Sequence, residues 1–281
     1  EQLATLAAEE MRYLEFRSAW DTSILDLSDE QIDRASAMLR DAGIAVSSIG
    51  SPIGKIGITD DFAPHLERFD RALEVASRLD APFIRIFSFF IPKGDDPATH
   101  REAVLDRLHQ IVDRAAGHSV TLLHENEKDI YGDVPERCLD ILASIDAPQF
   151  RAAWDPANFV QCGVRPHDEG YEALRPYIAY VHVKDARLAD GQVVPAGEGD
   201  GQVRETVRAL RDSGDGAARA GTPGASAGAP GASAGAPAAS AVPSAASPAP
   251  SAAPSTVQAR PPAPPAPAPA PAPAAAPAAP A

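Results

Sequence analysis

Three apolar runs of this sequence are each followed by a side chain that can bind a metal ion. Glu125, Asp155 and His182 stand at or directly after the ends of three successive runs. Taken singly, each has a simpler explanation, because an aspartate after a strand often begins a turn, and a buried histidine often only completes a hydrogen bond. Taken together, two carboxylates and one imidazole suit a divalent cation such as Mn²⁺, Mg²⁺, Co²⁺ or Zn²⁺. The pattern therefore predicts a metal site, provided that the three runs end in one place.

A second set of polar side chains also follows apolar runs and is expected to contact a substrate. Its members carry a charge or an amide, which suits hydroxyl groups or a phosphate. They are Glu15, Arg17, Lys55, Asn158 and Lys184. For Glu15 and Arg17 an alternative stays open, in which the two side chains pair with each other inside the protein and contact no substrate.

The apolar runs alternate with segments of helical periodicity. Ser28 and Gln31 have the spacing of a capping box, and apolar side chains then recur at helical spacing up to Gly43. The predicted strands are 13–17, 44–49, 82–90, 120–123, 151–154 and 178–183. The other predicted helices are 2–10, 62–73, 104–112, 135–145, 171–174 and 203–210. This alternation indicates a parallel sheet, whose functional side chains lie at the carboxyl ends of the strands.

Six strands are fewer than a complete (β/α)8 barrel contains. A helix precedes the first strand and another follows the last, which fits an incomplete TIM barrel without its first and eighth strands. We expect this barrel domain to cover residues 1–213. A doubly wound open sheet is the alternative, although no strand is followed by the pattern Gly-x-Gly-x-x-Gly.

Residues 214–281 differ in composition from the rest of the chain. From residue 217 onward there is no acidic or aromatic residue, and 17 of the 28 prolines lie there among Ala, Ser and Gly. Such a segment has too few large apolar groups to offset the entropy of ordering its backbone. We therefore predict a disordered, Ala/Pro-rich tail over residues 214–281.

Charge and cysteine content argue against several classes of function. The whole chain has a net charge of −14, of which the first 216 residues carry −16 and the remainder +2. An acidic surface disfavours non-specific nucleic-acid binding. No apolar run is long enough to span a bilayer, so we expect no membrane partner. The two cysteines, Cys138 and Cys162, form no disulfide framework and are typical of a reduced, cytoplasmic protein.

Three segments resemble sugar phosphate isomerases and epimerases of the xylose isomerase-like TIM barrel superfamily. They are LLHENEKDIYGDVPERCLDIL (122–142), RAAWDPANFVQCG (151–163) and YVHVKDA (180–186). The resemblance covers about residues 1–213, and the superfamily also contains tagatose-type epimerases, hydroxypyruvate isomerase, inosose dehydratase and endonuclease IV. It implies a metal-dependent enzyme of carbohydrate metabolism that acts on a small sugar or sugar phosphate. A homo-oligomer is compatible with this expectation.

The resemblance also implies which residues bind the metal. Family members typically hold it with Glu, Asp, His and Glu from the last four strands, and the motifs place the first three on Glu125, Asp155 and His182. Glu127 competes for the first position, but Glu125 lies nearer the strand end. The fourth glutamate should end an eighth strand, where this sequence instead continues into the Ala/Pro-rich tail. Glu198, in a glycine-rich loop, is an imaginable substitute, although such a flexible loop more simply exposes its acids to water.

The reaction that the resemblance implies is proton removal next to a carbonyl. In the family, the metal polarises that carbonyl and stabilises an enediolate, and Glu125 is here the expected catalytic base as well as a ligand. Because the eighth strand and its glutamate are missing, we expect a C-terminally truncated or frameshifted member with an exposed sheet edge, low stability and little or no epimerase activity. The chain also opens inside a predicted helix, which suggests that its N-terminus is cut. The alternatives are an inosose dehydratase-like lyase and a non-catalytic product. Endonuclease-like hydrolysis is disfavoured, because the second strand ends in Ser51-Pro52 without a histidine.

Overall fold

A sheet of six parallel strands forms the centre of the fold. The computed structural model describes residues 2–213, and the predicted tail, residues 214–281, lies outside them. The strands have the order β1-β4-β5-β6-β7-β8, and each pairs in parallel with its neighbour. The prediction of six parallel strands in an α/β fold is confirmed. The described residues thus contain six of the eight strands of a complete barrel.

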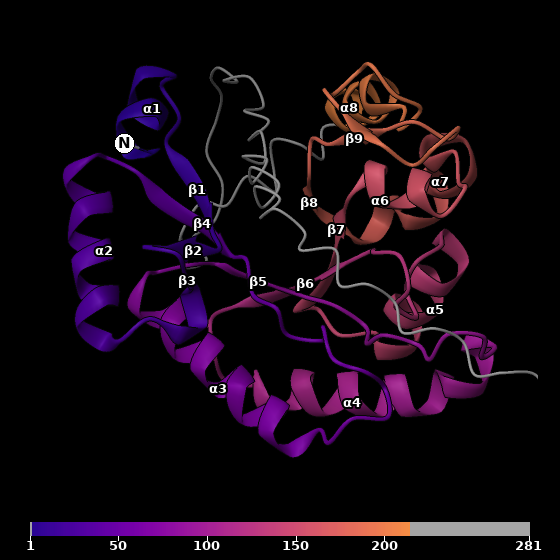
Figure 1. Ribbon diagram of the computed structural model, residues 1–281, viewed down its shortest axis with the longest axis horizontal. Helices are drawn as coiled ribbons and strands as arrows, with labels where there is room; N and C mark the ends of the chain where they lie inside the picture. The colour runs from indigo at the N-terminus through magenta and orange to yellow at the C-terminus, as the bar shows by residue number, and fades with distance from the viewer. Residues whose placement is uncertain (1, 214–281) are drawn as a thin grey trace, which may run out of the picture. The chain divides into compact units, whose positions relative to one another are not determined.

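Helices pack along the outer side of this sheet, and Figure 1 shows α2, α3, α4 and α5 following its curve. The strands of the sheet are β1 (Tyr13–Phe16), β4 (Ala45–Ile49), β5 (Phe83–Ile86), β6 (Thr121–Glu125), β7 (Phe150–Trp154) and β8 (Ile178–Val181). The α-helices are α1 (Gln2–Ala8), α2 (Asp29–Asp41), α3 (Ala63–Arg78), α4 (Arg101–Arg114), α5 (Pro135–Ile145), α6 (Pro156–Gln161), α7 (Glu172–Leu174) and α8 (Val203–Asp212). Among the described residues, no helix has the length and apolar character needed to cross a bilayer.

Short elements that the sequence did not indicate connect these strands and helices. Two hairpins follow β1 and β8: β2 (Ser18–Ala19) with β3 (Thr22–Ser23), and β9 (Asp185–Ala186) with β10 (Val193–Val194). One-turn helices of 3₁₀ or π type cover Ile24–Asp26, Pro97–His100, His167–Tyr171 and Arg175–Tyr177. Because β9 directly follows β8, its hairpin lies at the end of the sheet where the predicted site residues stand.

The start of α2 is determined by its own sequence. The Ser28 hydroxyl accepts a hydrogen bond from the Gln31 backbone N–H at 3.3 Å, and the Gln31 side chain accepts one from the Ser28 backbone N–H at 2.8 Å. The predicted capping box is therefore confirmed. Ile32, Ala35 and Leu39 then lie on one face of the helix and are buried.

The predicted strand over residues 82–90 is too long, since β5 ends at Ile86. After that residue the chain pairs with the loop that follows β4. The Phe87 N–H donates to the Ile53 carbonyl at 2.8 Å, and the Phe89 N–H donates to the Gly54 carbonyl at 3.0 Å. These backbone groups are satisfied outside the six-stranded sheet, so the strand ends four residues earlier than its apolar sequence suggests.

The strand register places the three predicted ligands on one face of the sheet. Glu125 of β6 lies opposite Ala153 of β7, and Ala153 lies opposite Tyr180 of β8. Side chains two residues apart on a strand share a face, so Asp155 and His182 follow Ala153 and Tyr180 on the side that Glu125 occupies. This side is the inner face, opposite the helices.

Candidate metal centre

Glu125, Asp155 and His182 meet at the carboxyl ends of β6, β7 and β8. One ligand atom from each residue lies within 4.8 Å of those of the other two. All three residues are buried, with 5%, 1% and 6% of their surface exposed. The competing candidate, Glu127, instead forms an ion pair of 2.5 Å with Lys55. The structure thus brings together Glu125 and not Glu127 with the other two predicted ligands.

Asp155 serves two purposes at once. It is the N-cap of α6, because its Oδ1 accepts a hydrogen bond of 2.9 Å from the Asn158 backbone N–H. Its Oδ2 points elsewhere and lies 3.6 Å from Nδ1 of His182 and 3.4 Å from Nζ of Lys184. The simple explanation for this aspartate, a helix cap, is therefore correct, yet it leaves one carboxylate oxygen in the centre.

Asn126 fixes the backbone of Asp155. Its side-chain amide donates to the Asp155 carbonyl and its amide oxygen accepts from the Asp155 N–H, both at 2.9 Å. This pair of hydrogen bonds ties the end of β6 to the end of β7. Asn158 adds a second link, because its amide donates to the Asn126 carbonyl at 2.9 Å. The backbone that carries Glu125 and Asp155 is thus held in place on both strands.

Glu125 has one carboxylate oxygen in hydrogen bonds and one without. Its Oε1 lies 3.1 Å from His182 Nδ1 and 3.3 Å from the Asn158 amide nitrogen. Its Oε2 is buried and has no hydrogen-bond partner among the described residues. The Arg85 Nε is 3.2 Å away, but its N–H is not aligned for a hydrogen bond. Glu125 thus offers one buried oxygen without a hydrogen bond and one beside His182, in a group that also contains Asp155, and two carboxylates with an imidazole fit a divalent cation.

Glu15 does not pair with Arg17, and the alternative of an internal Glu15–Arg17 pair is wrong. Arg85 donates from Nη1 to Oε1 of Glu15 at 2.7 Å, and Nε2 of His182 lies 2.9 Å from Oε2 of Glu15. Arg17 is exposed. The carboxylate of Glu15 is compensated by Arg85 and His182, whereas Arg17 lies beyond the end of β1, where its side chain is exposed to water.

Of the remaining predicted contacts, Asn158 and Lys184 lie beside the centre, whereas Lys55 does not. Lys184 donates to Asn158 Oδ1 at 2.7 Å and neighbours Asp155, so both of these predicted residues border the centre. Lys55 belongs to a different group, in which its ammonium pairs with Glu127 and lies 4.2 Å from the centre of the Phe87 ring.

Neighbouring charges outweigh the effect of burial on the ionisable groups of the centre. Burial alone would lower the pKa of His182, but the Glu125 carboxylate and the contacts with Asp155 and Glu15 raise that pKa well above its usual value. Burial alone would raise the pKa of Glu125, but His182 and Arg85 hold it well below its usual value. The pKa of Glu15 is lowered in the same way by Arg85 and His182, against the effect of burial.

Arg85 is the residue of the centre that the sequence reasoning missed. It lies in β5, between Ile84 and Ile86, and only 8% of its surface is exposed. The predicted strand 82–90 places the strand end at residue 90, whereas β5 ends at Ile86, directly after Arg85. An arginine inside an apolar strand was the available signal, since a buried arginine must find acidic partners.

The glycine-rich loop that contains Glu198 does not supply a further ligand. Glu198 is exposed and is not part of the group of three. The loop is organised around the buried Asp185, whose carboxylate accepts hydrogen bonds from the N–H groups of Gly197, Gly199 and Gly201 at 2.8, 3.1 and 2.8 Å. A Cβ at Gly199 would lie 2.4 Å from the Ala186 carbonyl oxygen. The loop that was expected to be flexible is therefore an ordered turn, whose backbone N–H groups bind the carboxylate of Asp185.

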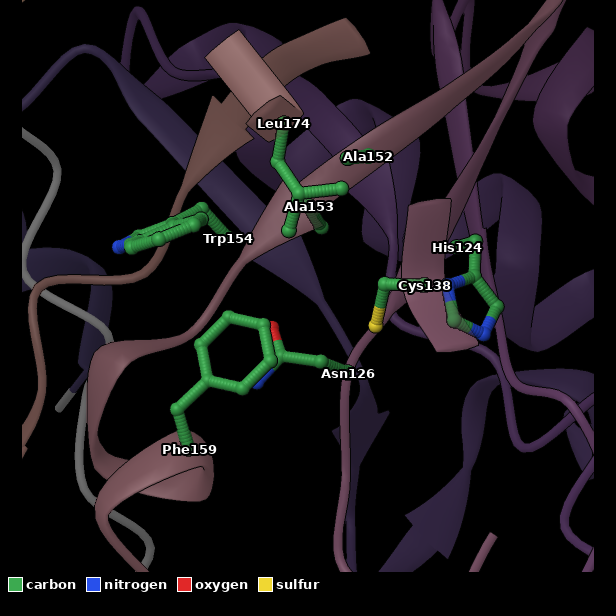
Figure 2. Close-up of a pocket in the computed structure, with 8 residues that line it drawn as sticks. All are labelled: His124, Asn126, Cys138, Ala152, Ala153, Trp154, Phe159 and Leu174. Carbon is green, nitrogen blue, oxygen red and sulfur yellow. The ribbon is translucent and has the colours of Figure 1, made fainter. Parts of the chain in front are cut away.

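A small cavity lies behind the centre, between the sheet and its helices. Figure 2 shows Trp154 and Phe159 on one side of it and His124 and Cys138 on another. Its volume is about 10 Å³, which is room for about one water molecule. Burial lowers the pKa of His124 to about 4, so this imidazole is neutral. The cavity is therefore too small for a sugar.

Comparison with known proteins identifies the family. A family model described as a xylose isomerase-like TIM barrel matches residues 3–241. The chain belongs to this family. The 3-dehydroshikimate dehydratase of Bacillus anthracis is 24% identical over 161 residues, which are 57% of this chain and 57% of that protein. The 2-epi-5-epi-valiolone 7-phosphate 2-epimerase of an Actinoplanes species is 28% identical over 179 residues, or 63% of this chain and 64% of that protein. The chain thus spans less than two thirds of the length of either relative.

Several solved structures share the fold. A D-tagatose 3-epimerase-like protein has a TM-score of 0.65 at 19% identity, covering 75% of this chain and 81% of that one. A xylose isomerase-like TIM barrel protein from Mycobacterium smegmatis, solved in complex with magnesium, has a TM-score of 0.60 at 22% identity, covering 76% and 77%. The protein IOLI, solved with a bound zinc atom, has a TM-score of 0.60 at 15% identity, covering 75% and 78%. These likenesses establish the fold, and two of the structures contain a divalent metal.

Proposed function

We propose that this protein is a divalent-metal-dependent isomerase or epimerase of a small sugar or sugar phosphate. The domain of residues 1–213 would carry the metal centre, with Glu125, Asp155 and His182 as ligands. The supporting observation is that one ligand atom each of Glu125, Asp155 and His182 lie within 4.8 Å of one another, while Oε2 of Glu125 is buried beside Arg85 without a hydrogen bond among the described residues. Mn²⁺, Mg²⁺, Co²⁺ and Zn²⁺ all suit two carboxylates and an imidazole. When bound, the ion would polarise the substrate carbonyl and stabilise negative charge on its oxygen.

Glu125 is the proposed catalytic base. Its carboxylate would accept the proton from the carbon next to the carbonyl, so that the C–H bond breaks, an O–H bond forms, and an enediolate results. Return of the proton to the adjacent carbon completes an isomerisation, whereas return to the opposite face of the same carbon completes an epimerisation. Lys184 and Asn158 border the centre and are proposed to hold substrate hydroxyl or phosphate oxygens.

A dehydratase is the second candidate, and the similarity to 3-dehydroshikimate dehydratase favours it. The first step would be the same proton removal by Glu125. The enolate would then restore the carbonyl and form a carbon–carbon double bond as the C–O bond of the hydroxyl on the next carbon breaks. That hydroxyl would take up the proton held by Glu125 and leave as water. Substrates of this class have a hydroxyl group on the carbon β to the carbonyl.

Incubation of the full chain with Mn²⁺ in deuterated water distinguishes the candidates. The substrates are a panel of ketoses, ketose phosphates and 3-dehydroshikimate. An isomerase or epimerase yields a product of unchanged formula with deuterium on carbon, whereas a dehydratase yields a product that has lost water and absorbs in the ultraviolet.

Glu125→Gln is expected to lower turnover by at least 10²-fold in this assay, because the amide cannot accept the proton. Glu67→Gln is the matched control, since Glu67 is exposed on α3, and it is expected to retain wild-type turnover. Turnover by Glu125→Gln equal to that of the control would contradict the assignment of the base. If the wild-type chain exchanges no carbon-bound proton with any of these substrates, the proposed function is wrong.

A further inference from the structure

Four side chains of alternating charge, three of them buried and that of Glu15 partly buried, form a closed ring beside the candidate metal centre. Glu15 contacts Arg85 at 2.7 Å and His182 at 2.9 Å, and Glu125 contacts His182 at 3.1 Å and Arg85 at 3.2 Å. Between 6% and 14% of each side chain is exposed. We call these four residues the charge ring. They come from β1, β5 and β6 and from the residue directly after β8, so the ring joins the two end strands of the sheet across its inner face.

Glu15 lies on the far side of the His182 imidazole from the three candidate ligands. His182 directs Nδ1 toward Glu125 and Asp155, at 3.1 and 3.6 Å, and directs Nε2 toward Glu15. The two ring nitrogens of an imidazole point in diverging directions, so one ion at Nδ1 is out of reach of a carboxylate that is hydrogen-bonded to Nε2. Glu15 is also outside the group of residues whose ligand atoms lie within 4.8 Å of one another.

We propose that Glu15 is a positioning residue that holds the proton on Nε2 of His182 and thereby directs Nδ1 toward the metal. The inference rests on the proposed metal-dependent function. A carboxylate can only accept a hydrogen bond, so the nitrogen that faces Glu15 carries a hydrogen atom. Without a metal, Nδ1 carries one as well, because it faces Glu125 and Asp155; a cation held by those two carboxylates would replace that hydrogen, while Glu15 keeps the one on Nε2. Carboxylate–histidine–metal arrangements of this kind fix the tautomer and the orientation of the imidazole.

Arg85 holds the Glu15 carboxylate in the orientation in which its Oε2 faces Nε2 of His182. Its Nη1 binds the Glu15 oxygen that does not face His182, so each oxygen of that carboxylate has its own partner. The same guanidinium lies beside Oε2 of Glu125, and its orientation is restricted further by the Phe87 ring, whose centre is 5.2 Å away. One planar cation thus sets the positions of the carboxylate that orients the imidazole and of the carboxylate that is a candidate ligand.

Mn²⁺ affinity of the full chain tests the proposal through a measurement other than turnover. The free-ion electron paramagnetic resonance signal gives the dissociation constant for wild type, Glu15→Gln and the surface control Glu67→Gln. Glu15→Gln is expected to bind Mn²⁺ 10- to 100-fold more weakly, as is typical when the partner of a ligating histidine is removed. Equal affinities of Glu15→Gln and Glu67→Gln would overturn the proposal.

The tautomer of His182 in the zinc-loaded wild-type protein provides a second test that needs no folded Glu15 variant. Long-range ¹⁵N–¹H correlation spectra of histidine-labelled protein show which ring nitrogen carries the hydrogen, and His182→Asn identifies the signals of His182. The expected state has the hydrogen on Nε2. A hydrogen on Nδ1 would overturn the inference about Glu15 while metal binding itself stands. If wild type binds neither Mn²⁺ nor Zn²⁺, the proposed metal-dependent function fails, and this inference fails with it.

Discussion

Charge compensation explains at the residue scale why the centre is built as it is. Three carboxylates, from Glu15, Glu125 and Asp155, are buried beside the cationic groups of Arg85 and His182. A buried charge is stable only when it is paired, so none of these side chains can be exchanged independently of the others. A substitution in this network is therefore expected to destabilise the fold whether or not the substituted residue contacts a substrate.

Removal of the Arg85 charge is expected to destabilise the fold. Arg85→Met keeps a long apolar side chain but leaves Glu15 Oε1 without its partner. We expect the free energy of unfolding to fall by about 3 kcal/mol, as is typical for an ion pair that loses one buried member. Chemical denaturation followed by circular dichroism measures this change.

Arg17→Met is the matched control for that experiment, since Arg17 is exposed on the chain directly after β1. It should change the free energy of unfolding by no more than about 0.5 kcal/mol. Equal losses for the two variants would mean that Glu15 depends on Arg17 as much as on Arg85, contrary to the contacts in the structure.

Local elements could be predicted from the sequence, and elements set by distant partners could not. The α2 cap depends on Ser28 and Gln31, and the bounds of α5 agree with the predicted helix 135–145, because the signals for both lie within a few residues. The end of β5 depends on pairing of the following residues, Phe87 and Phe89, with Ile53 and Gly54, which lie 34 and 35 residues earlier in the chain, and the apolar sequence of 82–90 does not reveal this pairing.

The same division applies to the candidate site. Glu125, Asp155 and His182 could be predicted because each stands at a strand end, and strand ends meet in a parallel sheet. The partners of Glu15 are separated from it by 70 and 167 residues, so nothing in the local pattern around residue 15 distinguished Arg85 and His182 from the neighbouring Arg17.

The loop after β4, which pairs with the residues that follow β5, is held by a neutral histidine. Nε2 of His65, on α3, accepts a hydrogen bond of 2.7 Å from the Gly54 N–H, and burial, together with Arg68 and Arg107, lowers the pKa of His65 to about 4 from its ordinary 6.5. The unfolded chain therefore binds a proton at this histidine between those two pH values, whereas the folded chain does not.

Stability should consequently fall as the pH decreases from about 6.5 to about 4, with a slope from this one group of up to about 1.4 kcal/mol per pH unit. His65→Gln can still accept the bond from Gly54 but does not titrate. The difference in unfolding free energy between wild type and His65→Gln, measured at several pH values, isolates the effect. A difference that stays constant between pH 7 and pH 4 would show that His65 titrates alike in the folded and unfolded states.

At the scale of the whole described region, side chains connect strands that the backbone does not pair. The hydroxyl groups of Ser47 and Tyr180 are 2.9 Å apart and join β4 to β8, and Glu15 joins β1 to His182. These contacts cross the inner face of the curved sheet, while the backbone hydrogen bonds follow the strand order. A cation held by Glu125, Asp155 and His182 would add a further link among β6, β7 and β8.

Mn²⁺ should therefore raise the thermal stability of the chain, because an ion that binds only the folded state stabilises it by mass action. At a concentration 100 times the dissociation constant the gain is about 2.7 kcal/mol, which corresponds to roughly 5–10 °C in Tm for a domain of this size.

Asp155→Asn is the sharpest control, since asparagine is as good an N-cap as aspartate and preserves the start of α6 while it removes the charge of the candidate ligand. Scanning calorimetry with Mn²⁺ and with a chelator should show the increase in wild type and lose most of it in Asp155→Asn. An equal increase in both proteins would place the stabilising ion elsewhere on the acidic surface and would remove Asp155 from the proposed centre.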